Sequence, residues 1–300
     1  MRIPISARIA LLAFANIGMV TGCNGSGSSG LPGTPERTTQ SIPLTVHKLY
    51  VVNDGDNTVR TYRPDGTQTI PTITAGLNGA RGIAVDANGK IYVANFVAGS
   101  SPSYRVTTYL PDGTQTSPTI TAGLCGPDAV AIDRHFKIYV VSVCGGVNIY
   151  SPDGTQVGTI TDGLNGPQGI TIDLNGKIYV TNYSSSGQSF VTTYRPDGTR
   201  TTPTITTGMN FPEGILVDGS GKIYVSNFGS NDVTTYRADG TQLSSITAGF
   251  DGPEGMAFND GKLYVANING NNVTTYRKKS GKQGSPTISG LNTPIGIAFH

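Results

Sequence analysis

One repeating unit decides the fold, and its clearest copy spans residues 167–206. It reads Pro167-Gln-Gly-Ile-Thr-Ile-Asp173, Leu-Asn-Gly, Lys177-Ile-Tyr-Val-Thr-Asn182, a variable segment, Val191-Thr-Thr-Tyr194, Arg-Pro-Asp-Gly198 and, after a short gap, Thr204-Ile-Thr206. Asn-Gly and Pro-Asp-Gly are turn signals, and each lies between two apolar or β-branched segments. The unit therefore predicts four short antiparallel strands, named a to d in chain order.

Two marker sequences show that the unit occurs six times. Lys-(Ile/Leu)-Tyr-Val begins at residues 48, 90, 137, 177, 222 and 262. A segment resembling Gly-Ile-Ala-Val-Asp begins at residues 82, 129, 169, 214, 255 and 296. Radial repetition of four-stranded units predicts an all-β fold, a six-bladed β-propeller of four-stranded blades.

The ends of the repeat array predict how the ring closes. The sixth strand a ends at His300, and the first strand b begins at Lys48 with no strand a before it. Pairing the two makes one blade from both ends of the domain and removes the open edges. We expect residues 47–300 to form this closed ring.

Composition agrees with the β-propeller and excludes other classes. The chain has 41 Gly, no Trp and only 13% charged residues. Without Arg2 and Arg8, which lie in the leader described next, 21 − 2 leaves 19 basic residues against 19 acidic ones. A neutral chain without a basic stripe is not expected to bind nucleic acid, and no run after residue 20 is long enough to span a membrane.

The first 46 residues predict export and a lipid anchor. Residues 1–22 have the form of a signal peptide, with the apolar run Ile9–Val20. Val20-Thr21-Gly22-Cys23 resembles the bacterial lipobox, which implies lipidation of Cys23; the alternative is ordinary secretory cleavage beside an unmodified cysteine. Asn24 then implies sorting to the outer membrane, on its periplasmic or surface side, in a Gram-negative host.

Residues 23–46 are rich in Gly, Ser and Thr and have no hydrophobic periodicity. A flexible coil of this length spans roughly 25 to 30 Å, so it predicts a tether that holds the domain clear of the envelope. We expect a monomer that contacts the membrane only through its anchor.

The repeat resembles the NHL repeat and the related YVTN-type repeats. Tyr179-Val-Thr-Asn182 is a literal instance, and the resemblance covers residues 48–300. It implies the propeller fold and leaves function open, because such propellers include lactonases, lyases, receptors and scaffolds.

The d-to-a and b-to-c connections share one face of the ring, here the loop face; the a-to-b and c-to-d turns form the opposite turn face. The residue after Pro in Pro-x-Gly forms the innermost ring of the loop face. Its six members are Arg81, Asp128, Gln168, Glu213, Glu254 and Ile295. A distant similarity to the gluconolactonase/regucalcin propellers implies that Asp128, Glu213 and Glu254 hold a divalent cation such as Ca²⁺, Mg²⁺ or Mn²⁺, with Arg81 or Gln168 contacting substrate. The alternative is a solvated channel mouth partly neutralised by Arg81.

A wider rim surrounds this ring. Asn residues follow Tyr-Val-x in five units; Asn95, Asn182 and Asn227 are candidate ligand contacts, and the alternative role is to cap the next turn. The candidate aromatic rim consists of Phe96, Tyr104, Tyr183, Phe190, Phe211 and Phe228. Such residues beside Ser and Gly suit a binding surface, or they pack the loops onto the blades.

Three further expectations concern charge pairs, histidine and cysteine. Asp at the end of strand a and Lys at the start of strand b, as in Asp86 and Lys90, are expected to pair across the hairpin.

All three histidines fall on the turn face, which disfavours histidine-dependent chemistry on the loop face. Cys125 and Cys144 flank one hairpin on the loop face of an exported protein, so we predict a disulfide between them.

The leading functional hypothesis is a non-catalytic binding or scaffold module that presents its loop face to a protein, peptide or glycan at the envelope. The alternative is a lactone or ester hydrolase that depends on a divalent metal. The sequence identifies no catalytic residue.

Overall fold

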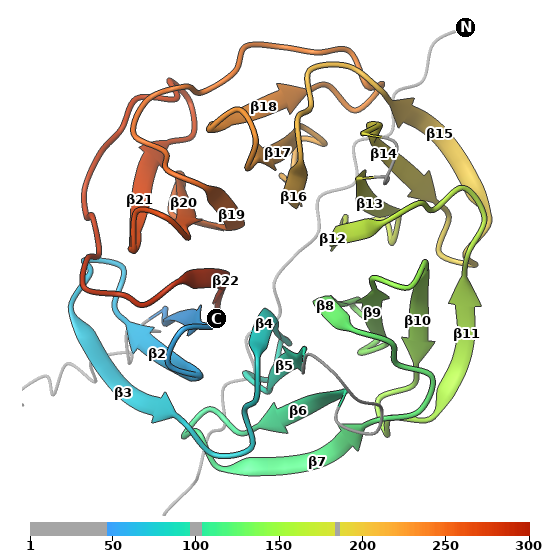
Figure 1. Cartoon of the computed structure of the whole chain (residues 1–300), viewed down its shortest axis with the longest axis vertical. Helices are drawn as coiled ribbons and strands as arrows, with labels where there is room; N and C mark the ends of the chain where they lie inside the picture. The colour runs from blue at the N-terminus through green and yellow to red at the C-terminus, as the bar shows by residue number, and fades with distance from the viewer. Residues whose placement is uncertain (1–46, 97–103, 184–186) are drawn as a thin grey trace, which may run out of the picture. The chain divides into compact units, whose positions relative to one another are not determined.

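A computed structural model describes residues 47–96, 104–183 and 187–300. In this part of the chain the regular structure consists of 22 β-strands, arranged in six antiparallel sheets around a central axis (Figure 1). The described residues include no helix long and apolar enough to cross a membrane. The predicted six-bladed β-propeller is confirmed.

Each sheet is one blade, numbered here around the ring from the closing blade. Blade 1 contains β22 (Pro294–Phe299), β1 (Leu49–Asn53), β2 (Thr58–Tyr62) and β3 (Gln68–Ile73); blade 2 contains β4 (Ala80–Val85), β5 (Ile91–Asn95), β6 (Arg105–Tyr109) and β7 (Gln115–Ile120). Blade 3 contains β8 (Pro127–Ile132), β9 (Ile138–Ser142), β10 (Gly146–Tyr150) and β11 (Gln156–Ile160); blade 4 contains β12 (Pro167–Ile172), β13 (Ile178–Tyr183), β14 (Ser189–Tyr194) and β15 (Arg200–Ile205). Blade 5 contains β16 (Pro212–Val217), β17 (Ile223–Asn227) and β18 (Asp232–Tyr236); blade 6 contains β19 (Pro253–Asn259), β20 (Lys262–Asn267) and β21 (Asn272–Arg277).

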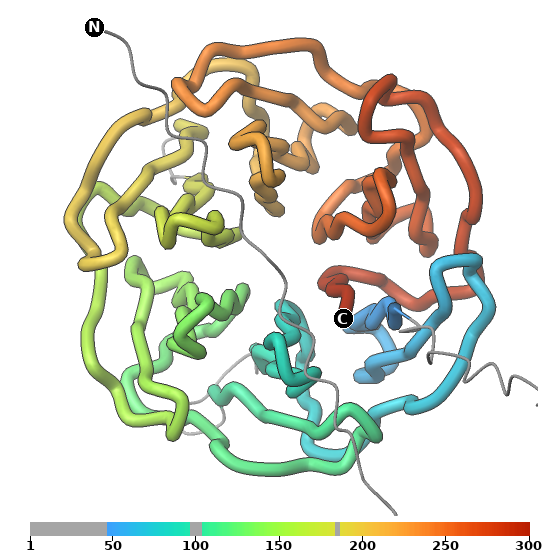
Figure 2. Tube along the Cα trace, turned by 180° about the vertical axis from the view of Figure 1, so that it is seen from behind, coloured from blue at the N-terminus to red at the C-terminus, as the bar shows by residue number. Residues whose placement is uncertain are grey.

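Blade 1 closes the ring as predicted. Strand β22 pairs antiparallel with β1, and Leu49 lies opposite Phe299. The backbone N–H of Lys48 donates to the carbonyl of His300 at 2.9 Å, and the reverse bond is 3.0 Å long. Seen from behind, the last segment of the chain lies beside the first described one (Figure 2).

The second strand of each blade is buried along nearly its whole length because neighbouring blades cover both of its faces; the exceptions are Tyr183 at the end of β13 and Lys262 at the start of β20, which are half-buried. In β17, for example, every residue from Ile223 to Asn227 is buried. The third strand adds a tyrosine whose hydroxyl donates to the connection arriving from the previous blade, as Tyr236 does to the carbonyl of Thr207 at 2.7 Å. Apolar packing and buried hydrogen bonds together therefore join adjacent blades.

The outer strand departs from prediction in blades 5 and 6. Instead of a fourth strand, each blade keeps isolated bridges, Val233 with Ile246 in blade 5 and Val273 with Ile288 in blade 6. Ser244-Ser245 and Gly284-Ser285 stand in these outer segments. Gly lowers strand propensity, and Ser is not among the β-branched and aromatic residues that favour strands, which explains the incomplete pairing.

The expected Asp–Lys pairs across the a-to-b turns are wrong. The carboxylate of Asp86 accepts the backbone N–H groups of Asn88 and Lys90 at 2.8 and 3.0 Å. The ammonium of Lys90 instead donates to the carbonyl of Ser117 on the outer strand. Aspartate thus caps the turn, because its short side chain reaches nearby backbone donors.

Deleting Pro294–His300 removes β22 and leaves β1 with an unpaired edge. We expect the truncated chain to lose the single cooperative unfolding transition of the domain, which circular dichroism and calorimetry can follow. His300→Ala is the control, since it keeps the backbone bonds to Lys48. A truncated chain that melts like the full chain would contradict the closure.

Candidate functional site

The innermost ring of the loop face is set by close contact between neighbouring inner strands. A Cβ on Gly214 would lie 2.4 Å from the carbonyl oxygen of Glu254 in the next blade, so this contact between blades 5 and 6 needs glycine at position 214. The same holds at the equivalent glycines of four other blades, Gly82, Gly169, Gly255 and Gly296. Blade 3 has Ala129 at this position. The residue before each of these positions therefore lies at the mouth of the central channel.

Two hydroxyl side chains strengthen the ring at its acidic members. Thr181 accepts the N–H of Gly169 at 2.7 Å and donates to the carbonyl of Glu213 at 2.8 Å. Ser226 likewise donates to the carbonyl of Glu254 at 2.6 Å. Sequence analysis missed both residues, although they are the only hydroxyls at the x of Tyr-Val-x-Asn.

Arg81 and Asp128 form an ion pair within the ring. Their Nη1 and Oδ1 atoms are 2.8 Å apart, and Asp128 keeps only 12% of its side chain exposed. The guanidinium also lies 4.5 Å from the ring centre of Phe96. Burial raises the pKa of Asp128, and the nearby Arg81 offsets this only in part.

Glu213 and Glu254 are the other two carboxylates of the ring, and both side chains are half-buried. Burial raises the pKa of Glu254 to about 8, with added repulsion from Asp128 and Asp54. Burial, followed by repulsion from Glu254 and Asp128, also raises the pKa of Glu213 well above its usual range. The mouth therefore combines four interacting carboxylates with one arginine.

Asp54 is the carboxylate that sequence analysis did not include. It follows Asn53 at the end of β1, the position that Phe96 and Tyr183 occupy in their own blades. Its charge acts on Arg81, Asp128 and Glu254. Comparing the residue after Asn across the six units would have identified it.

The predicted metal ligands do not assemble into a ligand group. Within residues 47–96, 104–183 and 187–300, no three His, Cys, Asp or Glu side chains are placed to hold a metal ion. Asp128 instead binds Arg81. Below the mouth, a channel of about 330 Å³ continues between the inner strands, lined mostly by apolar residues such as Ile83 and Ile215.

Phe211 and Tyr183 form the most exposed aromatic contact of the rim. Their ring centres are 4.1 Å apart, and Phe211 is 41% exposed. Phe211 has φ of +51°, at a position where four other blades have glycine. A left-handed backbone is costly for a bulky side chain and is typical of functional sites, so this phenylalanine is a strong candidate for ligand contact.

The other predicted rim aromatics are half-buried. The ring centres of Phe96 and Tyr104 are 6.1 Å apart, and Tyr104 also packs against the core between blades 2 and 3. Phe190 lies within β14 opposite Asn182, and Phe228 begins the turn after β17. Among these four residues, Phe228 adjoins the exposed pair, because its backbone N–H donates to the carbonyl of Phe211 at 3.0 Å.

Asn95, Asn182 and Asn227 are not ligand contacts, because all three side chains are completely buried. The Oδ1 atom of Asn95 accepts the N–H of Asn78 at 2.9 Å, and its Nδ2 donates to the hydroxyl of Thr107 at 3.0 Å. The asparagines thus hold the d-to-a connection against strand b. The alternative role predicted from the sequence was a cap on the turn that follows strand b.

The predicted disulfide between Cys125 and Cys144 is confirmed. The Cα atoms are 5.8 Å apart, and the bond closes a loop with a sequence separation of 19. It joins the segment before β8 to the turn after β9, beside Phe96, which packs near Gly126. Cys23 lies outside the described residues.

Comparison with known proteins supports the fold through structure alone. No protein-family model and no curated protein matches the chain. A structure titled "Crystal structure of Nidogen/Laminin Complex" matches with a TM-score of 0.73 at 17% identity, covering 84% of this chain and 98% of the other. The chain folds as a six-bladed β-propeller.

Two further structural matches to the propeller are lyases. A streptogramin B lyase gives a TM-score of 0.57 at 15% identity, covering 81% of this chain and 73% of the other. A catalytically inactive His-to-Ala variant of virginiamycin B lyase from Staphylococcus aureus, with quinupristin, gives a TM-score of 0.58 at 18% identity. The match covers 84% of this chain and 78% of the other. In this propeller His47 and His300 border a turn-face cavity, and His135 lies in an a-to-b turn, so the loop face has no histidine.

Glu254 predicts a specific dependence of stability on pH. A raised pKa means that its contribution is fully present below about pH 4.5 and is lost as the pH rises toward 8. When the pH rises from 5 to 8.5, the free energy of unfolding of Glu254→Gln should therefore increase by about 1 to 2 kcal/mol relative to that of the wild type. Urea unfolding at both pH values measures the difference.

Asp112→Asn is the matched control, because hydrogen bonds from Thr114 lower the pKa of this exposed carboxylate. It should show no gain at high pH. Equal pH profiles for Glu254→Gln and the wild type would contradict the account of the acidic mouth.

Proposed function

We propose that the protein is an exported, lipid-anchored binding module that captures a protein segment on its loop face. The observation that carries this proposal is the exposed Phe211 stacked on Tyr183, held in a strained backbone two residues before Glu213. The match to a propeller from a nidogen/laminin complex supports a protein partner. Glycine at position 211 would avoid the strain, so the aromatic side chain needs a purpose beyond folding.

The charges of the mouth favour a cationic group on that segment. Asp54, Asp128, Glu213 and Glu254 interact there, and only Arg81 opposes them. A lysine or arginine side chain would relieve the repulsion between the carboxylates, while its aliphatic stem packs on the aromatic pair. Binding should therefore release protons and strengthen as the pH rises toward 8.5.

The metal-dependent hydrolase is less well supported. It needs Asp128, Glu213 and Glu254 to converge, and the described residues hold no such group. Elemental analysis of the purified protein after dialysis against calcium, with Glu213→Gln as control, tests this alternative separately. Stoichiometric metal that the variant loses would favour the hydrolase.

A peptide titration tests the proposed function. The probes are acetyl-Gly-Ser-Lys-Ser-Gly-amide and the same peptide with acetyl-lysine, followed by NMR shifts at pH 6 and pH 8.5. We expect the lysine peptide to bind, more tightly at pH 8.5, and the neutral peptide to bind at least about fivefold more weakly, because a paired charge contributes about 1 kcal/mol.

Two variants separate binding from stability. Phe211→Gly should weaken binding at least fivefold while the free energy of unfolding changes by less than about 1 kcal/mol, because relief of strain offsets the lost contacts. Thr293→Gly relieves the same left-handed backbone in blade 1, at φ of +50°, and should keep full binding. Equal binding of both peptides, or full binding by Phe211→Gly, would refute the proposal.

A further inference from the structure

The c-to-d turn of blade 6 breaks the charge pattern of the repeat. The other five blades place aspartate in this turn, as in Arg195-Pro-Asp-Gly-Thr199. Blade 6 reads Arg277-Lys-Lys-Ser-Gly-Lys282, which removes the carboxylate and adds three lysines. This concentration of positive charge stands out in a chain whose charges otherwise balance.

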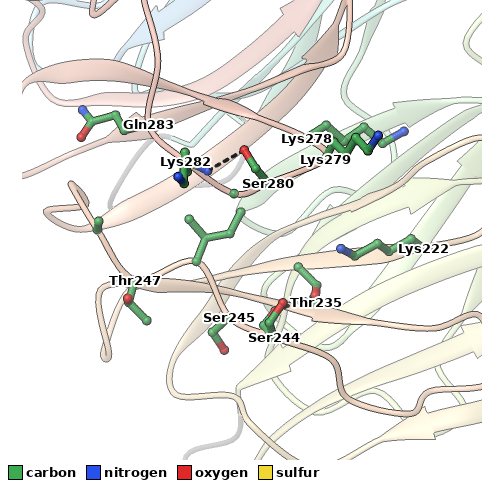
Figure 3. Close-up of a pocket in the computed structure, with 13 residues that line it drawn as sticks. Lys222, Thr235, Ser244, Ser245, Thr247, Lys278, Lys279, Ser280, Lys282 and Gln283 are labelled. Atoms are coloured by element: carbon green, nitrogen blue, oxygen red, sulfur yellow. Dashed lines mark hydrogen bonds between the residues drawn. The ribbon is translucent and has the colours of Figure 1, made fainter.

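The basic turn borders a cavity of about 400 Å³ between blades 5 and 6. Lys222, Lys278 and Lys279 gather at one end of it, and Lys282 lies toward the other (Figure 3). The opposite wall comes from residues 244–248, the outer segment of blade 5 that does not form a strand. Small Ser244 and Ser245 side chains leave the space open and supply hydroxyl donors.

The lysines differ in how they are held. Lys278 binds Asp218 at 3.0 Å and lies over the ring of Phe258. Burial raises the pKa of Asp218, but hydrogen bonds from Ser220 and Lys278 outweigh it and bring the value to about 2, so this ion pair persists at neutral pH. Lys279 and Lys282 are exposed, and the described part of the chain gives their ammonium groups no acceptor. Two cations are thus free for an anionic ligand.

The cavity lies next to the point where the N-terminal segment joins the propeller. His47 and Lys278 line one neighbouring cavity of about 420 Å³, together with Asp218 and His300. The covalent path from His47 leads back to Cys23 and the apolar run Ile9–Val20. The anchor expected at Cys23 would keep the propeller within a tether's length of the membrane, and a lipid headgroup bound by the lysines would then select this sector of the turn face.

We propose that the cavity lined by Lys222, Lys279 and Lys282 binds the phosphate group of an anionic phospholipid. This contact replaces the expectation that the protein touches the membrane only through its anchor, and it fixes the orientation of the propeller. Each of the other five c-to-d turns carries an aspartate, and these are Asp65, Asp112, Asp153, Asp197 and Asp239, so blade 6 offers an anionic surface the most basic of the six turns. The propeller therefore tilts onto blades 5 and 6, and its loop face stays open to the partner. The proposal rests on the export part of the proposed function, not on the identity of the loop-face ligand.

Vesicle sedimentation tests the contact without the anchor. The chain from residue 23 onward, carrying Cys23→Ser, is mixed with vesicles of phosphatidylcholine alone or with one quarter phosphatidylglycerol. We expect at least tenfold stronger partitioning onto the anionic vesicles, and loss of roughly tenfold in the double variant Lys279→Gln/Lys282→Gln. Arg134→Gln/Lys137→Gln removes two exposed charges from an a-to-b turn on the same face and should change partitioning less than twofold.

Several outcomes would overturn the proposal. These are no preference for anionic vesicles, equal losses in the two double variants, or abolition of vesicle binding by millimolar inorganic phosphate, which would indicate a free-phosphate site. Binding of heparin through the same lysines without vesicle binding would assign the cavity to a soluble polyanion. Lysine-peptide binding by Lys279→Gln/Lys282→Gln should be unchanged, so failure here is distinguishable from failure of the loop-face function.

Discussion

The close approach of neighbouring inner strands is the constraint on which the structure depends. At Gly214 a single added methyl group would overlap the backbone of the next blade, and four other blades repeat this arrangement. The short spacing brings six side chains to one channel mouth and forces carboxylates together. Because burial and crowding oppose ionisation, the fold itself raises the pKa values of Glu213 and Glu254.

The functional features lie where individual units depart from the repeat. Most positions are fixed by the same turns and buried strands in every blade and by the same asparagine contacts in five of the six. Phe211 replaces a glycine at a left-handed position, Asp54 replaces an apolar or aromatic residue, and the blade 6 turn exchanges aspartate for lysine. The first two build an aromatic and acidic mouth on the loop face. The third creates a basic cavity on the opposite face, so one ring can contact two different partners.

Much of the fold could be predicted from the sequence because it follows from local signals. Turn residues, alternation of apolar segments and six marker copies identified the blades, the closing pair and the disulfide. Contacts between side chains that are distant in sequence could not be predicted from these local signals. The prediction of Asp–Lys pairs was wrong because the aspartate binds nearer backbone donors. The prediction that the rim asparagines contact a ligand was wrong because their side chains are buried at the strand ends. The stacking of Tyr183 on Phe211 joins two blades, and nothing in either unit alone indicates it.

The spacing of the inner strands is tested most directly by Gly214→Ala, compared with Gly219→Ala in the same blade. A Cβ at position 214 would meet the carbonyl of Glu254 at 2.4 Å, whereas nothing lies within 4 Å of one at position 219. Urea unfolding should show a loss of about 2 to 3 kcal/mol for Gly214→Ala and little change for Gly219→Ala. Equal stability of the two variants would contradict the central claim that backbone contact between inner strands sets the ring.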